Sequence, residues 1–244
     1  MNEDNHPPLH HAALNGQLSR VELLLASGAF IEAWDKDENT PLHLAVWKGH
    51  INVVELLLGK GASIQKRNKY SNAPLHLAAW NGHTRMVELL LQNDAPIGVM
   101  NRYLNTPLHV AVSKGHTGTV ELLLGKGASI GTMGQSYNTP LHVATRNGYP
   151  DTVELLLKKG APIQTPNKHY NTPLHLASWN GHTGIVEILL RNGAPIQTMN
   201  RFGNTPLHLG VLKGYTAIVE LLLAKGAFVG TVGCNNNTPL HTAT

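Results

Sequence analysis

The stretch Asn39-Thr40-Pro41-Leu42-His43-Leu44-Ala45 decides the fold of this chain, because versions of it return along the whole sequence at a fixed interval. Its tripeptide Pro-Leu-His begins at Pro8, Pro41, Pro74, Pro107, Pro140, Pro173, Pro206 and Pro239, each 33 residues after the previous copy. No insertion or deletion interrupts the interval. A strict period of this length is typical of proteins built from stacked structural repeats.

The residues of one repeat predict two short helices followed by a loop. Thr40 is a good N-cap, Pro41 stands where a missing N–H costs nothing, and His43 can hydrogen-bond back to the cap. A second helix containing Val53–Leu58 is apolar on more than one face, and Gly61 suits the left-handed residue that ends it. Two short helices cannot bury that much leucine alone, so the repeats must stack into a solenoid.

The order Asn-Thr-Pro-Leu-His-x-Ala, Gly-His, Val-Glu-Leu-Leu-Leu and Gly-Ala closely resembles the ankyrin repeat. Residues Asn39–Ala62 and Asn171–Ala194 show it most fully, and the resemblance extends over residues 5–244. It implies an all-α repeat solenoid of helix-turn-helix units with β-hairpin or loop fingers, seven full repeats plus a partial eighth, in a single domain, 1–244. The repeat units are approximately 2–34, 35–67, 68–100, 101–133, 134–166, 167–199, 200–232 and 233–244.

The sequence departs from the ankyrin pattern in two respects. The fingertip glycine is kept only at Gly203, and its equivalents are Glu38, Ser71, Leu104, Tyr137, Tyr170 and Asn236. In the third repeat, Ala73 replaces the capping threonine and Asp94 replaces the glycine that ends the second helix. The third repeat is therefore predicted to be the least ideal.

Composition and charge narrow the classes of function. The chain has 42% hydrophobic residues, a single cysteine (Cys234) and no apolar run long enough for a membrane span, which favours a cytoplasmic or other reducing location. Residues 1–38 carry seven acidic and two basic side chains, and residues 39–244 carry eight acidic and 17 basic ones. We expect an acidic first end and a basic remainder.

The sequence offers no candidate catalytic residue, cofactor or metal ligand. Eight of the 15 histidines recur once per repeat in Pro-Leu-His, where they are expected to pack and hydrogen-bond. Equivalent residues of successive repeats lie roughly 10 Å apart, the distance between packed helices, whereas zinc ligands must converge on one ion. The glutamates of the second helices recur in the same way, and no phosphate-binding loop or nucleophile motif is present.

Two rows of positions vary while the framework stays constant. The first row ends the first helix of each repeat, and the ankyrin resemblance implies that it lines a concave surface. Its candidate partner-binding residues are Trp47, Lys48, Trp80, Asn81, Lys114, Arg146, Trp179, Asn180, Leu212 and Lys213. The second row lies at the fingertips, with candidates Lys36, Lys69, Tyr70, Arg102, Tyr103, Lys168, His169, Arg201 and Phe202. Because a tryptophan needed for stacking would recur in every repeat, its patchy use indicates exposure, and tryptophan and arginine are common binding hot spots.

These observations favour a non-enzymatic protein–protein interaction module or scaffold. We expect a monomer that binds a protein partner with an acidic and partly apolar surface through its concave face and fingertips. Two alternatives stay open: a basic solenoid that binds nucleic acid through its lysines and arginines, and an engineered ankyrin-type binder. The basic residues are spread over the chain without a nucleic-acid reading motif, which disfavours the first alternative.

Leu123 tests the stacking model, because it is predicted to be central in the second helix of the fourth repeat. We expect Leu123→Ala to lower the free energy of unfolding by about 2–5 kcal/mol, the usual cost of truncating a core leucine. Denaturant titration measures it. A loss below about 0.5 kcal/mol, the range of surface substitutions, would mean that the helices do not stack in this way.

Overall fold

The computed structural model describes residues 7–233, 237–239 and 241. In this part of the chain the regular elements are α-helices and 3-10 turns, with no strand. Contacts between residues divide the chain into two compact units, residues 1–128 and 129–244. The predicted single domain stays a prediction, and each unit is described by itself below.

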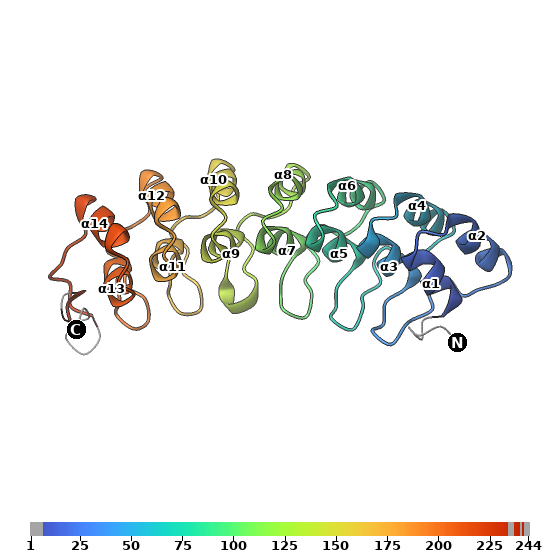
Figure 1. The fold of residues 1–244 in the computed structure, drawn as a ribbon, viewed down its shortest axis with the longest axis horizontal. Helices are drawn as coiled ribbons and strands as arrows, with labels where there is room; N and C mark the ends of the chain where they lie inside the picture. The colour runs from blue at the N-terminus through green and yellow to red at the C-terminus, as the bar shows by residue number, and fades with distance from the viewer. Residues whose placement is uncertain (1–6, 234–236, 240, 242–244) are drawn as a thin grey trace. The chain divides into compact units, whose positions relative to one another are not determined.

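The first unit contains four helix pairs, and each pair begins at a Pro-Leu-His tripeptide (Figure 1). The helices are α1 (Pro8–Leu14), α2 (Leu18–Ala26), α3 (Pro41–Lys48), α4 (Ile51–Gly59), α5 (Pro74–Trp80), α6 (Thr84–Gln92), α7 (Pro107–Ser113) and α8 (Thr117–Gly125). The first helices of successive repeats pack side by side, and each packs on the second helix of its own repeat. This arrangement confirms the all-helical repeat solenoid.

The second unit repeats this architecture with three helix pairs. They are α9 (Pro140–Asn147), α10 (Pro150–Lys158), α11 (Pro173–Asn180), α12 (Thr183–Arg191), α13 (Pro206–Leu212) and α14 (Thr216–Ala224), preceded by the 3-10 turn η1 (Gln135–Tyr137). Here α9, α11 and α13 pack side by side, as do α10, α12 and α14. The partial eighth repeat, with Cys234 and Asn236, lies largely outside the described residues.

The core consists of the constant apolar positions of the repeat. Leu42, Leu75, Leu141 and Leu174 of the first helices are fully buried. Leu123 of α8 and its counterparts in α4, α6, α10, α12 and α14 are equally buried, whereas Leu24 of α2 is partly exposed. A side chain at either position contacts its own repeat and an adjacent one, so the apolar surface that one repeat leaves open is covered by the next.

The Pro-Leu-His histidine links each first helix to the finger of the following repeat. In the second repeat, His43 Nδ1 accepts a hydrogen bond from the backbone N–H of Thr40 at 3.2 Å. His43 Nε2 lies 3.1 Å from the carbonyl oxygen of Asn72, so Nε2 carries the proton and donates. The same link joins His10 to Asn39, His76 to Asn105, His142 to Asn171, His175 to Asn204 and His208 to Asn237. The capping role predicted from sequence is therefore joined by a second one between repeats.

The fingers are loops whose ends are joined by a backbone hydrogen bond, as from Asn68 N–H to the Asn72 carbonyl at 3.0 Å. Their tips need a left-handed residue, and Glu38, Ser71, Leu104, Tyr137 and Tyr170 all adopt positive φ there, as Gly203 does. Ankyrin-type fingertip geometry is thus kept without glycine, at a local cost in backbone strain.

The third repeat has the weaknesses that its sequence predicts. Asp94 has φ of 61°, whereas the equivalent residues Gly61 and Gly127 adopt the same region freely. Ala73 offers no side-chain acceptor to His76 N–H, whereas Thr40 and Thr106 accept this bond in the neighbouring repeats. Repeat arrays open where such a unit is weak.

We expect the double change Ala73→Thr and Asp94→Gly to stabilise the chain, by about 1 kcal/mol for the restored cap and a comparable amount for the relieved strain. Native-state hydrogen exchange should show lower protection in residues 72–95 than in 171–194, and the double variant should close this gap. Equal protection of the two segments in the unchanged protein would contradict the prediction.

Candidate functional site

The tryptophans of the first row stand at or near the ends of first helices and are partly exposed. Trp47, Trp80 and Trp179 are 37%, 43% and 40% exposed. The backbone at Trp47 and at Trp80 is held by the next repeat. The carbonyl of Trp80 accepts a hydrogen bond from His116 Nε2 at 3.0 Å, and that of Trp47 accepts one from His83 Nε2 at 3.3 Å. The histidine of the Gly-His turn thus holds the helix ends that carry Trp47 and Trp80, whereas Tyr215 stands at the equivalent place for Trp179.

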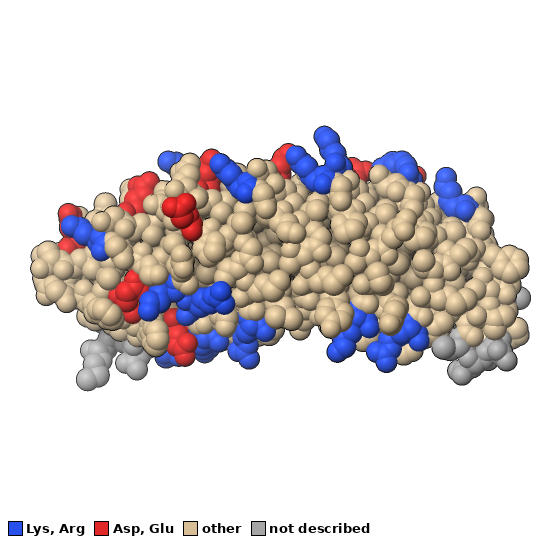
Figure 2. Space-filling model, turned by 180° about the vertical axis from the view of Figure 1, so that it is seen from behind, with Lys and Arg blue, Asp and Glu red and all other residues tan. Residues whose placement is uncertain are grey.

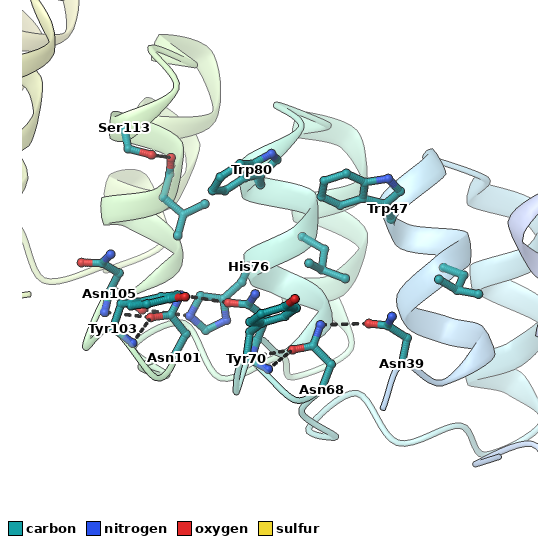
Figure 3. Close-up of a pocket in the computed structure, with 14 residues that line it drawn as sticks. Asn39, Trp47, Asn68, Tyr70, His76, Trp80, Asn101, Tyr103, Asn105 and Ser113 are labelled. Atoms are coloured by element: carbon teal, nitrogen blue, oxygen red, sulfur yellow. Dashed lines mark hydrogen bonds between the residues drawn. The ribbon is translucent and has the colours of Figure 1, made fainter. Parts of the chain in front are cut away.

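In the first unit, both rows meet in a groove of about 420 Å³, the first groove (Figure 3). Trp47 and Trp80 lie along one side of it, and Tyr70 and Tyr103 of the fingers lie along the other. The lining residues are Asn39, Leu44, Trp47, Asn68, Tyr70, Asn72, His76, Leu77, Trp80, Asn101, Tyr103, Asn105, Val110 and Ser113. None of them carries a formal charge when His76 is neutral.

Asparagines hold the fingers that carry the two tyrosines. Asn68 Oδ1 accepts hydrogen bonds from the backbone N–H groups of Tyr70 and Asn72, at 3.0 and 3.1 Å. Asn68 Nδ2 donates to Asn39 Oδ1 of the previous repeat at 2.8 Å, and Asn101 donates to Asn72 in the same way. This ladder of amides sets both the shape of each finger and its distance from the preceding one.

The sequence analysis did not predict the asparagine ladder, although the sequence contains a pattern that indicates it. Asparagine recurs at 68, 101, 167 and 200, with Asp35 at the equivalent place in the first finger. It also precedes the capping residue of every repeat after the first, at 39, 72, 105, 138, 171, 204 and 237. In the second unit, Asn167 donates to Asn138 and Asn200 donates to Asn171. A period of 33 residues in a buried amide indicates a hydrogen bond between neighbouring repeats.

The second unit contains an equivalent groove of about 440 Å³, the second groove. Its lining residues are Arg146, Asn171, His175, Leu176, Trp179, Asn180, Asn200, Phe202, Asn204, Leu209 and Leu212. Trp179 and Phe202 correspond to Trp80 and Tyr103 of the first groove, and Arg146 takes the place of Trp47. The two grooves therefore share their framework and differ in their variable side chains.

Several predicted basic residues stack on aromatic rings of this chain. Lys114 Nζ lies 3.6 Å from the centroid of the Trp80 ring. Lys213 Nζ lies 3.8 Å from the centroid of the Trp179 ring. Both distances are typical of cation–π contacts, which keep an indole in one orientation. In each pair the lysine belongs to the repeat after the tryptophan.

The basic residues of the fingertips stack on aromatic rings as well. The guanidinium of Arg102 lies 5.7 Å from the Tyr70 centroid and 5.3 Å from that of Tyr103, and the guanidinium of Arg201 lies 5.1 Å from the Phe202 ring. Lys69 pairs with Asp37 of the preceding finger. The residues of the fingertip row thus contact one another as well as solvent.

The remaining predicted residues lie at the margins of the grooves or beyond them. Asn81 donates its amide to the carbonyls of Trp47 and Leu77, and Asn180 donates to that of Leu176. Lys36, Lys48 and Lys168 are exposed, and His169 is partly exposed with its carbonyl bonded to Arg201 N–H. The structure does not place these four among the lining residues of either groove.

His76 and His175, on the floors of the two grooves, are held neutral. Burial lowers the pKa of each to about 4, from an ordinary value of 6.5. Burial has the same effect on His43 and His142, whose pKa values are also about 4. A neutral ring suits the tautomer deduced above, because Nδ1 must accept a hydrogen bond while Nε2 donates one.

Family models of ankyrin repeats match most of the chain. The model described as ankyrin repeats in three copies matches residues 1–68, 65–134 and 131–200, and the model of ankyrin repeats in many copies matches 185–223. The chain belongs to the ankyrin repeat family. No curated protein shows a significant match to the chain.

A solved structure resembles this arrangement of ankyrin repeats along most of its length. The crystal structure of the human ASB11 ankyrin repeat domain is 29% identical in sequence and superposes with a TM-score of 0.82. The match covers 90% of this chain and 98% of that one. Ankyrin repeats are generally protein–protein interaction modules, and their fold is typically a non-enzymatic scaffold.

Metal-binding clusters and membrane-spanning helices are absent from the described residues. No group of three or more His, Cys, Asp and Glu side chains is arranged to hold a metal ion there. No helix within the same residues is long and apolar enough to cross a membrane.

The depressed histidine pKa values predict how stability depends on pH. Between pH 6.5 and 4, the unfolded chain binds protons at these four histidines while the folded chain does not. The contribution of these histidines to the free energy of unfolding is therefore largest above pH 6.5. It falls as the pH drops towards 4, by up to about 1.4 kcal/mol per pH unit for each histidine. Urea unfolding between pH 6.5 and 5 measures this slope.

The variant His175→Gln should reduce that slope by about 1.4 kcal/mol per pH unit, since it removes one of the titrating groups. Its stability at pH 7 is compared separately, because glutamine can replace only part of the hydrogen bonding. A variant with the slope of the unchanged protein would contradict the assignment of a neutral, buried His175.

Proposed function

We propose that this protein binds a partner protein through the first and second grooves, with the groove tryptophans as anchors and the neighbouring basic residues at the rim. The observation that supports it most is the meeting of both variable rows in one hollow within each unit. Aromatic side chains that are partly exposed and fixed by neighbours supply contact area at a small entropic cost, which is the usual property of a hot spot.

The surroundings of the tryptophans fit such a role. The indoles of Trp80 and Trp179 carry a lysine on one face and are open elsewhere, so they are held in position before a partner arrives. The asparagine and histidine groups beneath them bond within the framework, which leaves aromatic and aliphatic surface as the exposed lining. Burying that surface against a partner removes apolar area from water.

Charge at the rim favours partners with acidic groups. Lys114, Lys213, Arg102 and Arg201 all lie beside groove aromatics, where they add positive potential next to the apolar lining. Such charges chiefly speed encounter with a partner of opposite sign and add less to the final affinity.

The test compares the tryptophans of the grooves with an exposed tryptophan outside them. Trp34 is 56% exposed, lies on the first finger and lines neither groove, which makes it a matched control. We expect affinity capture from lysate, followed by crosslinking mass spectrometry, to give a partner retained by Trp34→Ala and lost by the triple variant Trp47→Ala, Trp80→Ala, Trp179→Ala.

With that partner purified, single tryptophan-to-alanine variants should mainly raise the dissociation rate, costing about 2 kcal/mol or more at a hot spot. Rim variants such as Arg102→Gln should mainly slow association and weaken its salt dependence. If Trp47→Ala and Trp80→Ala instead destabilise the fold by several kcal/mol and leave the affinity of the folded protein unchanged, the tryptophans are structural and the proposal fails.

A further inference from the structure

The net positive charge of the chain belongs entirely to the second unit. Residues 1–128 contain eleven basic and eleven acidic side chains, whereas residues 129–244 contain eight basic and four acidic ones. The two grooves have equivalent frameworks, so the charged residues around them can be compared position by position.

Within the second unit, the two signs of charge occupy different elements. All four acidic residues lie on second helices: Asp151 and Glu154 on α10, Glu187 on α12 and Glu220 on α14. Glu154 is bonded there to Arg191 Nη2 at 2.8 Å. The first helices and fingers carry Arg146, Lys168, Arg201 and Lys213, and no acidic residue. The side of the unit that forms the second groove is therefore uniformly basic.

The first unit is different at the equivalent place. No lining residue of the first groove is a lysine, arginine, aspartate or glutamate. Among its fingers, acidic side chains occur only in the first, at Asp35, Asp37 and Glu38, and Asp37 pairs with Lys69. The fingers that carry Tyr70 and Tyr103 are basic, as in the second unit, so the difference between the grooves lies in their lining, where Arg146 replaces Trp47. Figure 2 shows red side chains among the blue ones near the N-terminal end of its lower edge, whereas the blue ones nearer the middle of that edge stand without red neighbours.

We infer that the second groove selects a protein segment in which an acidic residue adjoins an apolar one and binds its carboxylate through Arg146, for which the lining of the first groove has no charged counterpart. The inference rests on the proposed function. Arg146 lines the second groove at the position that Trp47 holds in the first, one repeat before Trp179, and a carboxylate bound in the groove can accept its N–H donors. The adjoining apolar side chain fits against Trp179, Phe202 and Leu212.

The lining of the second groove favours a protein segment over single-stranded nucleic acid. Proteins that bind single-stranded nucleic acid combine a basic groove with open aromatic faces on which the bases stack. Here Lys213 covers one face of Trp179 at 3.8 Å, and much of the remaining lining is aliphatic, from Leu176, Leu209 and Leu212. These surfaces complement a hydrocarbon side chain better than a base.

The test selects binders from a phage-displayed library of random peptides on the full chain and sorts them by the tryptophan on which they depend. Binders lost on Trp179→Ala define the second groove, and binders lost on Trp80→Ala define the first. We expect the second-groove peptides to be enriched in Asp or Glu next to an apolar residue. They should lose roughly tenfold or more in affinity on Arg146→Gln and weaken with added salt.

Lys158→Gln is the matched control, because Lys158 is an exposed base of the same unit on α10, outside the groove. It changes the net charge equally and should leave the affinity unchanged. The first-groove peptides should be less enriched in acidic residues and should show no response to Arg146→Gln.

Three outcomes would overturn the inference. Equal acidic content in the two sets of peptides, or an equal effect of Arg146→Gln and Lys158→Gln, would remove the difference in selectivity while the proposed function stands. Binding of fluorescein-labelled oligouridylate that is lost on both Trp179→Ala and Arg146→Gln would assign the groove to nucleic acid. A library in which no binder depends on a groove tryptophan would instead contradict the proposed function itself.

Discussion

The hydrogen bond from a buried histidine to the next repeat governs the geometry of this protein. Its Nε2 proton goes to an asparagine carbonyl in the following finger, and its Nδ1 accepts the backbone N–H of the residue that begins its own helix. Both bonds require a neutral ring, and burial enforces this by lowering the pKa. One side chain therefore fixes a helix start, a finger and the junction of two repeats at once.

The proposed binding surface follows from this constraint. Because histidine and asparagine set the distance between helix and finger, the residues at the helix end and at the fingertip can vary without disturbing the stack. Glu38, Ser71, Leu104, Tyr137 and Tyr170 show the same tolerance at the fingertips, where each takes a left-handed conformation that glycine would adopt at lower cost. A framework with strict hydrogen bonds thus permits a variable surface, which is the physical basis for binding modules built from repeats.

The two grooves illustrate how much chemistry a few substitutions change on this framework. Trp47 in the first groove and Arg146 in the second occupy the same position of the repeat, one apolar and one charged. Lys114 and Lys213 each stack on a tryptophan of the previous repeat. The orientation of Trp80 therefore depends on a residue 34 positions later in the sequence. Neighbouring repeats consequently contribute to a site jointly, and a repeat cannot be assigned a specificity in isolation.

The sequence by itself determined the helices, their pairing, the stacking and the missing side-chain cap at Ala73, because a strict 33-residue period shows which residues of different repeats are equivalent. It also predicted both variable rows and the left-handed conformation of Asp94. The tertiary structure alone decided that the rows meet in grooves, that Lys114 and Lys213 stack on tryptophans, and that Arg102 lies between two tyrosines. The reason is physical: a periodic sequence fixes which residues are equivalent, whereas contact between side chains of different repeats depends on the distance and rotation between them, which packing and the histidine–asparagine bonds establish only in the folded stack.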